Sequence, residues 1–244
     1  LAGVGDQALQ VSVQSQASLG GAYAFSDGTG AVASDASGNG NDAALDGATW
    51  TTAGKYGTAV SLDGVSDRIT VADADTLDLT TAFTLEGWIY PIRTSTWQAL
   101  VFKEPVSGSG PYSLWLTPQG RVYAELLPAG GGLKVVTGVA TVPVHAWTHV
   151  AATYDGTALR IWVNGLEEGS TAATGSAVTT AGPLWIGSTA NTYFFEGLLD
   201  EIRLYGRALS ASEILTDMTT PVDPGYGILG NSRIAGRGRR GGRT

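Results

Sequence analysis

The sequence predicts an all-β domain built as a sandwich or a barrel. Short segments in which apolar and polar residues alternate recur along most of the chain, and turn residues separate them. Glycine is frequent, with 35 in 244 residues, as expected of a chain with many turns. Evidence for helix is confined to one short segment that begins near Ser210. The candidate strands cover residues 21–25, 58–62, 68–71, 82–91, 99–103, 112–117, 121–127, 134–137, 147–154, 158–164, 184–187 and 197–205.

The clearest hairpin runs over residues 147–164. Asp155-Gly156 separates its two alternating runs, and this dipeptide accepts the positive φ angles of a tight turn. Alternate residues of a strand share a face, so we expect one face of the first run to point into the core. That face consists of Thr148, Val150, Ala152 and Tyr154.

The predicted helix follows the last strand. Ser210 is a good N-cap, and Glu213 stands three residues later, as a capping box requires. Leu209 and Ile214 flank this start and are spaced as a hydrophobic staple. We expect the helix to pack over one end of the sandwich.

The charge distribution excludes one class of partner for most of the chain. Residues 221–244 contain five arginines and Asp223, a net charge of +4, so residues 1–220 have a net charge of −12 within the total of −8. Nucleic-acid binding needs clustered lysine and arginine, and the acidic body lacks such clusters. The Gly/Arg-rich end is predicted to be a flexible linker-like tail without a specific partner.

Other compositional features narrow the chemistry. The chain has no cysteine, which excludes disulfides, thiolate nucleophiles and cysteine-ligated metal sites. No apolar run approaches the roughly 20 residues that span a bilayer, so no membrane span is expected. Low lysine content together with abundant glycine, serine, threonine and alanine suits a bacterial secreted or surface protein. Because the sequence starts at Leu1 without a signal peptide, we interpret it as a mature product or an excised module of a larger parent protein.

Six segments follow one another along the chain in the order AYAFSDGTG, SDASGNGNDA, GKYGTAVSLDGVSDRITV, FTLEGWIYP, WTHVAATYDGTALRIWVNG and GLLDEIRLYGRALSASEI. In this order they resemble the LamG-like, concanavalin A-like lectin/glucanase domains of bacterial extracellular proteins. The resemblance implies a two-sheet antiparallel jelly-roll sandwich over residues 20–218, after an N-terminal segment of residues 1–19 and before a tail of residues 219–244. It also implies a carbohydrate-binding or adhesion module, secreted or on the cell surface, with structural calcium.

Asp200 is the residue that points to a cation. Strand alternation places it on the apolar face of Leu198, Ile202 and Leu204, and places Arg203 on the opposite face, where Glu201 is its natural partner. A buried carboxylate needs a partner, and Ca²⁺ takes oxygen ligands from carboxylates and amides. The loop DASGNGNDA supplies such oxygens, so the predicted calcium ligands are Asp35, Asn39, Asn41 and Asp200. In the alternative, the loop is an ordinary turn and Asp200 accepts backbone hydrogen bonds.

Catalytic residues are not expected. Retaining glycoside hydrolases of this general fold carry paired carboxylates on one strand, and no strand here has glutamates or aspartates spaced in that way. Binding of a polysaccharide or glycan would instead use aromatic rings, among which Trp115, Tyr123 and Trp162 are candidates. The preferred ligand residues lie in loops and are Trp97, Asn191 and Tyr193. Two other interpretations stay open. One is a structural or protein-interaction domain without sugar specificity, and the other is a glycan-active enzyme, either a hydrolase with carboxylates from separate strands or a lyase that uses tyrosine and histidine.

Overall fold

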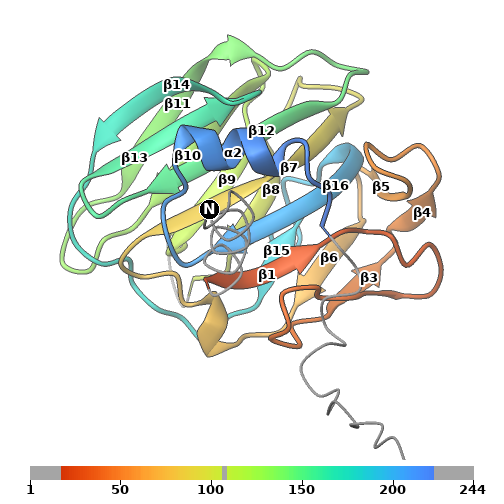
Figure 1. The fold of residues 1–244 in the computed structure, drawn as a ribbon, viewed down its shortest axis with the longest axis horizontal. Helices are drawn as coiled ribbons and strands as arrows, with labels where there is room; N and C mark the ends of the chain where they lie inside the picture. The colour runs from red at the N-terminus through yellow and green to blue at the C-terminus, as the bar shows by residue number, and fades with distance from the viewer. Residues whose placement is uncertain (1–17, 106–108, 223–244) are drawn as a thin grey trace, which may run out of the picture.

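The structure, a computed structural model, describes residues 18–105 and 109–222 and confirms the predicted two-sheet antiparallel jelly-roll sandwich with one short α-helix (Figure 1). Most of the predicted tail and of the predicted N-terminal segment lies outside the described residues, so these domain boundaries stay predictions. None of the helices in the described ranges is long and apolar enough to cross a membrane.

The helix-side sheet is the one that α2 (Ala211–Asp217) covers. Its strands are ordered β14-β13-β12-β7-β16-β5-β4, and β1 also pairs with β16. Their bounds are β14 Leu166–Ala172, β13 Ala158–Val163, β12 Thr148–Tyr154, β7 Phe83–Pro91, β16 Glu196–Tyr205, β5 Ala59–Asp63, β4 Thr49–Thr51 and β1 Leu19–Tyr23.

The opposite sheet is ordered β11-β10-β9-β8-β15-β6-β3-β2. Its bounds are β11 Lys134–Thr141, β10 Arg121–Leu126, β9 Tyr112–Leu116, β8 Gln98–Lys103, β15 Leu184–Ile186, β6 Arg68–Val71, β3 Ala43–Asp46 and β2 Val32–Ala33. A 3-10 turn, η1 (Asp75–Leu77), follows β6.

A large apolar cluster fills the space between the sheets. Phe83 of β7 packs against Tyr154 of the same sheet at 5.7 Å and against Tyr112 of the opposite sheet at 5.5 Å, measured between ring centroids. The hydroxyl of Tyr112 donates to the carbonyl of Leu77 at 2.6 Å, so its burial leaves no polar atom unpaired. The predicted inward face of β12 is confirmed, because Val150, Ala152 and Tyr154 belong to this cluster.

Helix α2 lies across the outer face of the helix-side sheet (Figure 1) and not over one end of the sandwich, so its predicted placement was wrong. The capping box is confirmed: the Ser210 side chain accepts from the Glu213 N–H, and the Glu213 side chain accepts from the Ser210 N–H. Leu209 and Ile214 pack with Trp162 in a second apolar cluster, which explains why this tryptophan is only 9% exposed.

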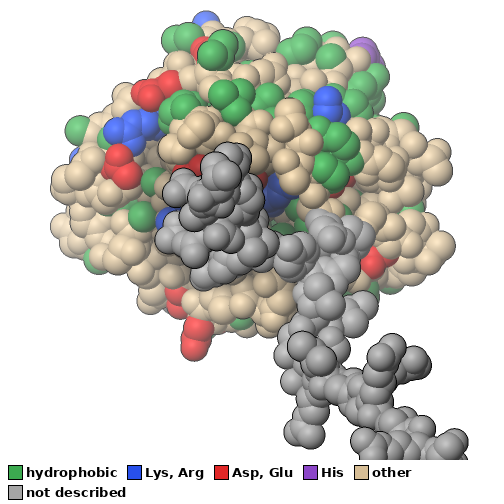
Figure 2. Space-filling model, viewed as in Figure 1, with side chains coloured by type: hydrophobic (Ala, Val, Ile, Leu, Met, Phe, Trp, Pro, Cys, Tyr) green, Lys and Arg blue, Asp and Glu red, His purple; other side chains and the backbone are tan. Residues whose placement is uncertain are grey.

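The polar surroundings of α2 limit the apolar surface on this side. Figure 2 shows hydrophobic side chains scattered over the visible part of this face, separated by polar side chains and backbone. The apolar side chains of the sheet that meet the helix are those of Ala151, Trp162 and Tyr205, and all three are buried.

A β-bulge in β16 reverses the predicted alternation of that strand. Asp200 pairs with Trp88 and Arg203 with Glu86, so three steps along β16 match two along β7. Glu201, within the bulge, has a φ of 55°. Asp200 and Arg203 therefore share the outer, helix-side face. The predicted inward orientation of Asp200 was wrong, whereas Ile202 and Leu204 point into the core and Arg203 points away from it, as predicted.

The sequence did not predict strands β2, β3, β4 and β14. Strand β14 reads LEEGSTA, and its residues are half-buried or exposed because it lies at the edge of its sheet. An edge strand of this kind has few apolar residues to mark it.

Candidate functional site: an aromatic pocket

A shallow pocket of about 210 Å³ lies on the outer face of the opposite sheet. Its lining consists of four aromatic rings and one carboxylate, from Trp97, Trp115, Tyr123, Tyr193 and Glu125. The volume lies below the roughly 300 Å³ at which pockets for drug-sized ligands begin. It suits one sugar ring or one small head group.

Strand alternation places three of these side chains. In β9 the core receives Leu114 and Leu116, so Trp115 between them points outward. In β10 the core receives Val122 and Ala124, and Tyr123 points outward beside Trp115, its direct partner across the two strands. Glu125 follows on the same outer face, opposite Ser113.

Two loops bring the other rings. Trp97 precedes β8, where Gln98 fixes the chain by donating to the carbonyl of Arg93 at 2.9 Å and by accepting from the N–H of Glu196 at 2.9 Å. Tyr193 has a φ of 56°, and its carbonyl accepts from the N–H of Ala99 at 2.8 Å. The backbone at Tyr193 is therefore tied to β8, although 51% of its surface is exposed.

The rings stand nearly perpendicular to one another. Trp115 meets Trp97 at 88° and Tyr193 at 82°, with ring centroids 6.4 Å and 5.4 Å apart. Tyr123 meets Trp97 at 77° with centroids 5.1 Å apart. Trp115 is 7% exposed and Trp97 is 39% exposed, so a buried central ring is flanked by rings that reach solvent.

A hydrogen-bond chain orients the polar groups of the pocket. The indole Nε1–H of Trp115 donates to Ser113 Oγ at 2.6 Å, and that hydroxyl donates to Glu125 Oε2 at 3.0 Å. The Tyr123 hydroxyl donates to Glu125 Oε1 at 3.0 Å. Burial, followed by the negative charge of Glu125, raises the pKa of Tyr123, so the phenol stays protonated and keeps donating.

Of the predicted ligand residues, Trp97 and Tyr193 come together in this pocket, whereas Asn191 is not among its lining residues. Asn191 Oδ1 instead accepts from Arg68 at 3.2 Å. Sequence reasoning named Trp115 and Tyr123 as ring candidates without singling them out, and it missed Glu125. The alternation of apolar residues in β9 and β10 indicates which side chains point outward, but only the pairing of the two strands shows that Glu125 lies beside Trp115 and Tyr123.

The predicted calcium residues of the early loop form hydrogen bonds with other protein groups. Both carboxylate oxygens of Asp35 accept two bonds each: Oδ1 from the N–H groups of Ala22 and Ser37, and Oδ2 from Ser37 Oγ and the Asn41 N–H, over 2.7–3.0 Å. These bonds fill the four acceptor positions of a carboxylate. Asn39 and Asn41 donate through their amides to the carbonyl of Gly20. The loop is thereby fastened to β1.

Asp200 is bonded to another segment. Its Oδ2 accepts from the N–H of Tyr56 at 2.9 Å, and burial raises its pKa to about 6, an effect that this hydrogen bond partly offsets. Its Oδ1 is buried without a hydrogen-bond partner among the described residues. No group of three or more His, Cys, Asp or Glu side chains that would hold a metal ion occurs in the described ranges. The predicted set of Asp35, Asn39, Asn41 and Asp200 contains two amides beside its two carboxylates and so is not a group of this kind, and calcium binding stays a prediction.

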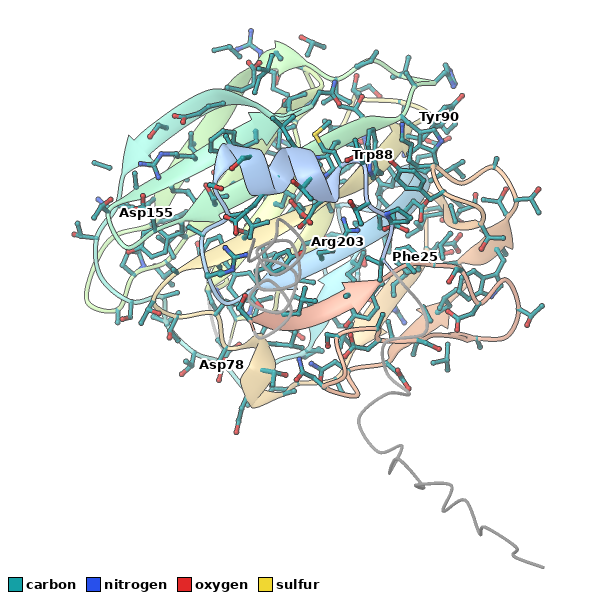
Figure 3. The ribbon with its side chains drawn as sticks, in the orientation of Figure 1. Phe25, Asp78, Trp88, Tyr90, Asp155 and Arg203 are labelled. Carbon is teal, nitrogen blue, oxygen red and sulfur yellow. The ribbon has the colours of Figure 1, made fainter. Side chains whose placement is uncertain are left out.

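A second polar cluster is buried beneath α2. Arg203 lies beside the helix (Figure 3) and donates to the carbonyls of Asp217 and Thr220 at 3.2 and 2.5 Å. Its guanidinium pairs with Glu201 at 3.0 Å, which confirms the predicted pair, and lies 3.8 Å from Glu86. This cluster fastens the C-terminal end of the described chain to the helix-side sheet.

Burial shifts the ionisation of this cluster. It raises the pKa of Glu201 to about 7, against the lowering effect of Arg203, and raises the pKa of Glu86 well above its usual value. His149, whose Nε2 is 3.8 Å from Glu86, has a pKa lowered to about 3 by burial and by the nearby charge of Arg203. The imidazole is therefore neutral near pH 7, and solvent does not reach it.

The fold is shared with binding domains of known structure. Domain 4 of AbnA, an extracellular GH43 arabinanase from Geobacillus stearothermophilus, in complex with arabinotriose, matches with a TM-score of 0.65 and 22% identity over 82% of this chain and 98% of that domain. The binding domain of Paraclostridial Mosquitocidal Protein 1 matches with a TM-score of 0.68 and 16% identity over 83% of this chain and 52% of that one.

The binding domain of botulinum neurotoxin DC in complex with SialylT matches with a TM-score of 0.66 and 9% identity over 84% of this chain and 51% of that one. The chain thus spans about half the length of these toxin domains. At such identities the likeness shows the fold alone. No match was found among curated protein sequences.

A family model described as the concanavalin A-like lectin/glucanases superfamily matches residues 63–215, which is more than half of the chain. The matched range runs from the end of β5 into α2 and includes all five residues of the aromatic pocket. The chain therefore belongs to the concanavalin A-like lectin/glucanase superfamily.

Proposed function

We propose that this chain is a non-catalytic carbohydrate-binding module whose ligand site is the aromatic pocket. The observation that carries the proposal is the meeting of four rings around one carboxylate, with Trp97 and Tyr193 open to solvent. Aromatic rings pack against the apolar faces of sugars, while carboxylates accept hydrogen bonds from their hydroxyls. The arabinotriose complex of the similar arabinanase domain supports a sugar-binding role for this architecture.

The positions of the carboxylates support binding without hydrolysis. A retaining glycosidase needs two carboxyl groups about 5 Å apart beside the substrate. Glu125 is the carboxylate among the described residues that line the pocket. Glu86, Asp200 and Glu201 lie on the other sheet and are at most 2% exposed, so a polysaccharide does not reach them. Glu125 therefore has no second carboxylate beside it in the described part of the pocket lining, and the three carboxylates of the other sheet are closed to a polysaccharide.

A glycan array with three variants tests this function. We expect the wild-type chain to bind a defined set of glycans, and Trp97→Ala or Tyr193→Ala to weaken that binding at least about tenfold, or ~1.4 kcal/mol. Tyr90→Ala is the matched control because Tyr90 is a half-buried aromatic residue of the helix-side sheet, where it contacts Trp147. Folded wild-type protein that binds no glycan would contradict the proposal and favour a structural or protein-interaction domain.

We also infer that the module works outside the cell as part of a larger protein. The cysteine-free, lysine-poor composition and the place of the similar domain in an extracellular arabinanase support this setting. Immunodetection of the parent protein in culture medium and on washed cells should find it in one of these fractions. Detection in the cytoplasm alone would contradict the inference.

A further inference from the structure

We propose that the aromatic pocket selects a glycan unit that carries a positively charged amino group. This inference rests on the proposed function, because it names the ligand class of the same pocket. The shared chemistry is an ammonium group, which an amino sugar presents on a polysaccharide and which choline presents on a head group. Of the two sources, the fold and the shallow, open pocket favour the amino sugar.

The charge of the lining is the first step of the argument. Glu125 contributes a carboxylate, and the other four lining residues are neutral aromatic side chains. The groups bonded to Glu125 are the hydroxyls of Ser113 and Tyr123, which satisfy two acceptor positions and bring no positive charge. Within the described residues no arginine or lysine forms an ion pair with Glu125. Glu125 therefore has no ion-pair partner in the part of the chain that the structure describes.

The arrangement of the rings is the second step. An aromatic ring carries negative potential on its face, so it attracts a cation placed over it. Trp97, Trp115, Tyr123 and Tyr193 meet at 77° to 88°, so they form walls that face different directions and not one flat platform. A neutral sugar can stack on the face of one ring. An ammonium group can be attracted by the faces of several rings and by the carboxylate of Glu125 at the same time.

The position of Glu125 against Tyr123 is the third step. The Tyr123 hydroxyl donates to Glu125 Oε1 at 3.0 Å, and the negative charge of Glu125 contributes to the raised pKa of Tyr123, so the carboxylate lies within reach of groups in the pocket. The same charge repels carboxylates and sulfates, and the net charge of −12 over residues 1–220 adds to this repulsion. Uronic acids and other anionic sugars are thus disfavoured.

The test compares three oligosaccharides of similar length by isothermal titration calorimetry with the full chain. They are a glucosamine hexamer, its fully N-acetylated counterpart and a galacturonic acid hexamer, at a pH where the glucosamine amines are protonated. We expect the glucosamine hexamer to bind at least tenfold more tightly than the N-acetylated one, and the galacturonic acid hexamer not to bind. Choline chloride should compete with the glucosamine hexamer, since it presents an ammonium group alone.

Two variants connect the preference to the pocket. Glu125→Gln keeps the size and one acceptor oxygen of the side chain, and we expect it to reduce the ratio of the glucosamine affinity to the N-acetylated affinity from at least tenfold to about twofold. Tyr90→Ala, on the other sheet, should leave both affinities unchanged. The comparison of the hexamers uses the wild-type chain, so it tests the ammonium preference even if Glu125→Gln destabilises the fold.

The outcomes separate this inference from the proposed function. Equal affinity for the glucosamine and N-acetylated hexamers would overturn the ammonium preference and leave carbohydrate binding intact. Tight binding of the galacturonic acid hexamer would overturn the preference in the same way. Binding of choline alone, with none of the hexamers bound, would overturn the amino sugar as ligand, and the glycan array would still decide the proposed function.

Discussion

Arg203 shows how one residue ties the buried charges of the helix-side sheet together. It is 5% exposed, pairs with Glu201, lies near Glu86 and donates to two carbonyls at the end of α2 and beyond it. Removing one partner of a buried ion pair leaves an uncompensated charge. The guanidinium therefore holds two acidic side chains and the C-terminal end of the described chain at once.

We predict that Arg203→Leu lowers the free energy of unfolding by about 3–5 kcal/mol at pH 7.5. Urea denaturation measures this loss. The pKa of Glu201 is already about 7 and that of Glu86 is raised, so protonation at pH 5 relieves the stranded charges and the loss should shrink. A loss below about 1 kcal/mol at pH 7.5 would contradict this role of the cluster.

His149 makes the stability of the wild-type chain depend on pH. Its pKa is about 3 in the fold and 6.5 in the unfolded chain, so the unfolded state binds the extra proton between these values and wild-type stability falls as the pH drops below 6.5. Glu86 and Arg203 face its ring, and Lys55 adds to the lowered pKa. His149→Gln removes this proton uptake.

Relative to wild type, His149→Gln should therefore gain about 2 kcal/mol between pH 7.5 and pH 5.0. Unfolding in urea at both pH values gives the difference, and the absolute cost of the substitution cancels. A stability gap that stays the same at both pH values would show that the imidazole is protonated in the fold. The matched surface control is His145, an exposed residue at a turn.

At the scale of elements, β16 shows where alternation fails as a guide. The hairpin of β12 and β13, the capping box of α2 and the inward face of β12 follow from local sequence, and the structure confirms each. The bulge at Glu201 adds one residue to β16, so before it Leu199 faces the core in place of Leu198 and Asp200, while Ile202 and Leu204 after it lie on their predicted face. The sequence of residues 200–203 does not predict the bulge, because the bulge is a feature of the pairing between β16 and β7.

Gly87 of β7 accommodates the bulge. A Cβ atom at this position would lie 2.3 Å from Cδ1 of Ile202, which the bulge turns toward the core. We predict that Gly87→Ala lowers the free energy of unfolding by about 1–3 kcal/mol through overpacking. Chemical denaturation should show no such loss for Gly132→Ala, because no atom lies within 4 Å of a Cβ built there. Equal effects of both substitutions would argue against the tight contact.

The candidate site was partly predictable at this scale. Trp97 and Tyr193 could be predicted as ligand residues because they are aromatic residues outside the predicted strands. Glu125 was not predictable, since its place beside the rings depends on the register of β9 against β10, which aligns it with Ser113. A single sequence contains the alternation of each strand but not the register between them.

At the scale of the whole molecule, the calcium prediction joins two distant parts of the chain. It requires Asp35 near β1 and Asp200 near Tyr56 to contribute to stability through an ion, whereas both already accept hydrogen bonds from protein groups. If the prediction holds, calcium at a hundred times its dissociation constant raises the free energy of unfolding by about 2.7 kcal/mol, and chelation removes this gain. Thermal melts with EDTA and with added calcium measure it, and magnesium is the control ion. Unchanged melting would contradict calcium binding.

The central claim is that the outer face of the sheet opposite α2 is the ligand face. Its most direct test is the indole region of a ¹H–¹⁵N NMR spectrum, because the seven tryptophans are spread over both sheets and the loops. During titration with the glycan found on the array, we predict that the signals of Trp97 and Trp115 shift and that those of Trp88 and Trp162, on the helix side, stay in place. Shifts at Trp88 or Trp162 with Trp97 and Trp115 unmoved would contradict the claim.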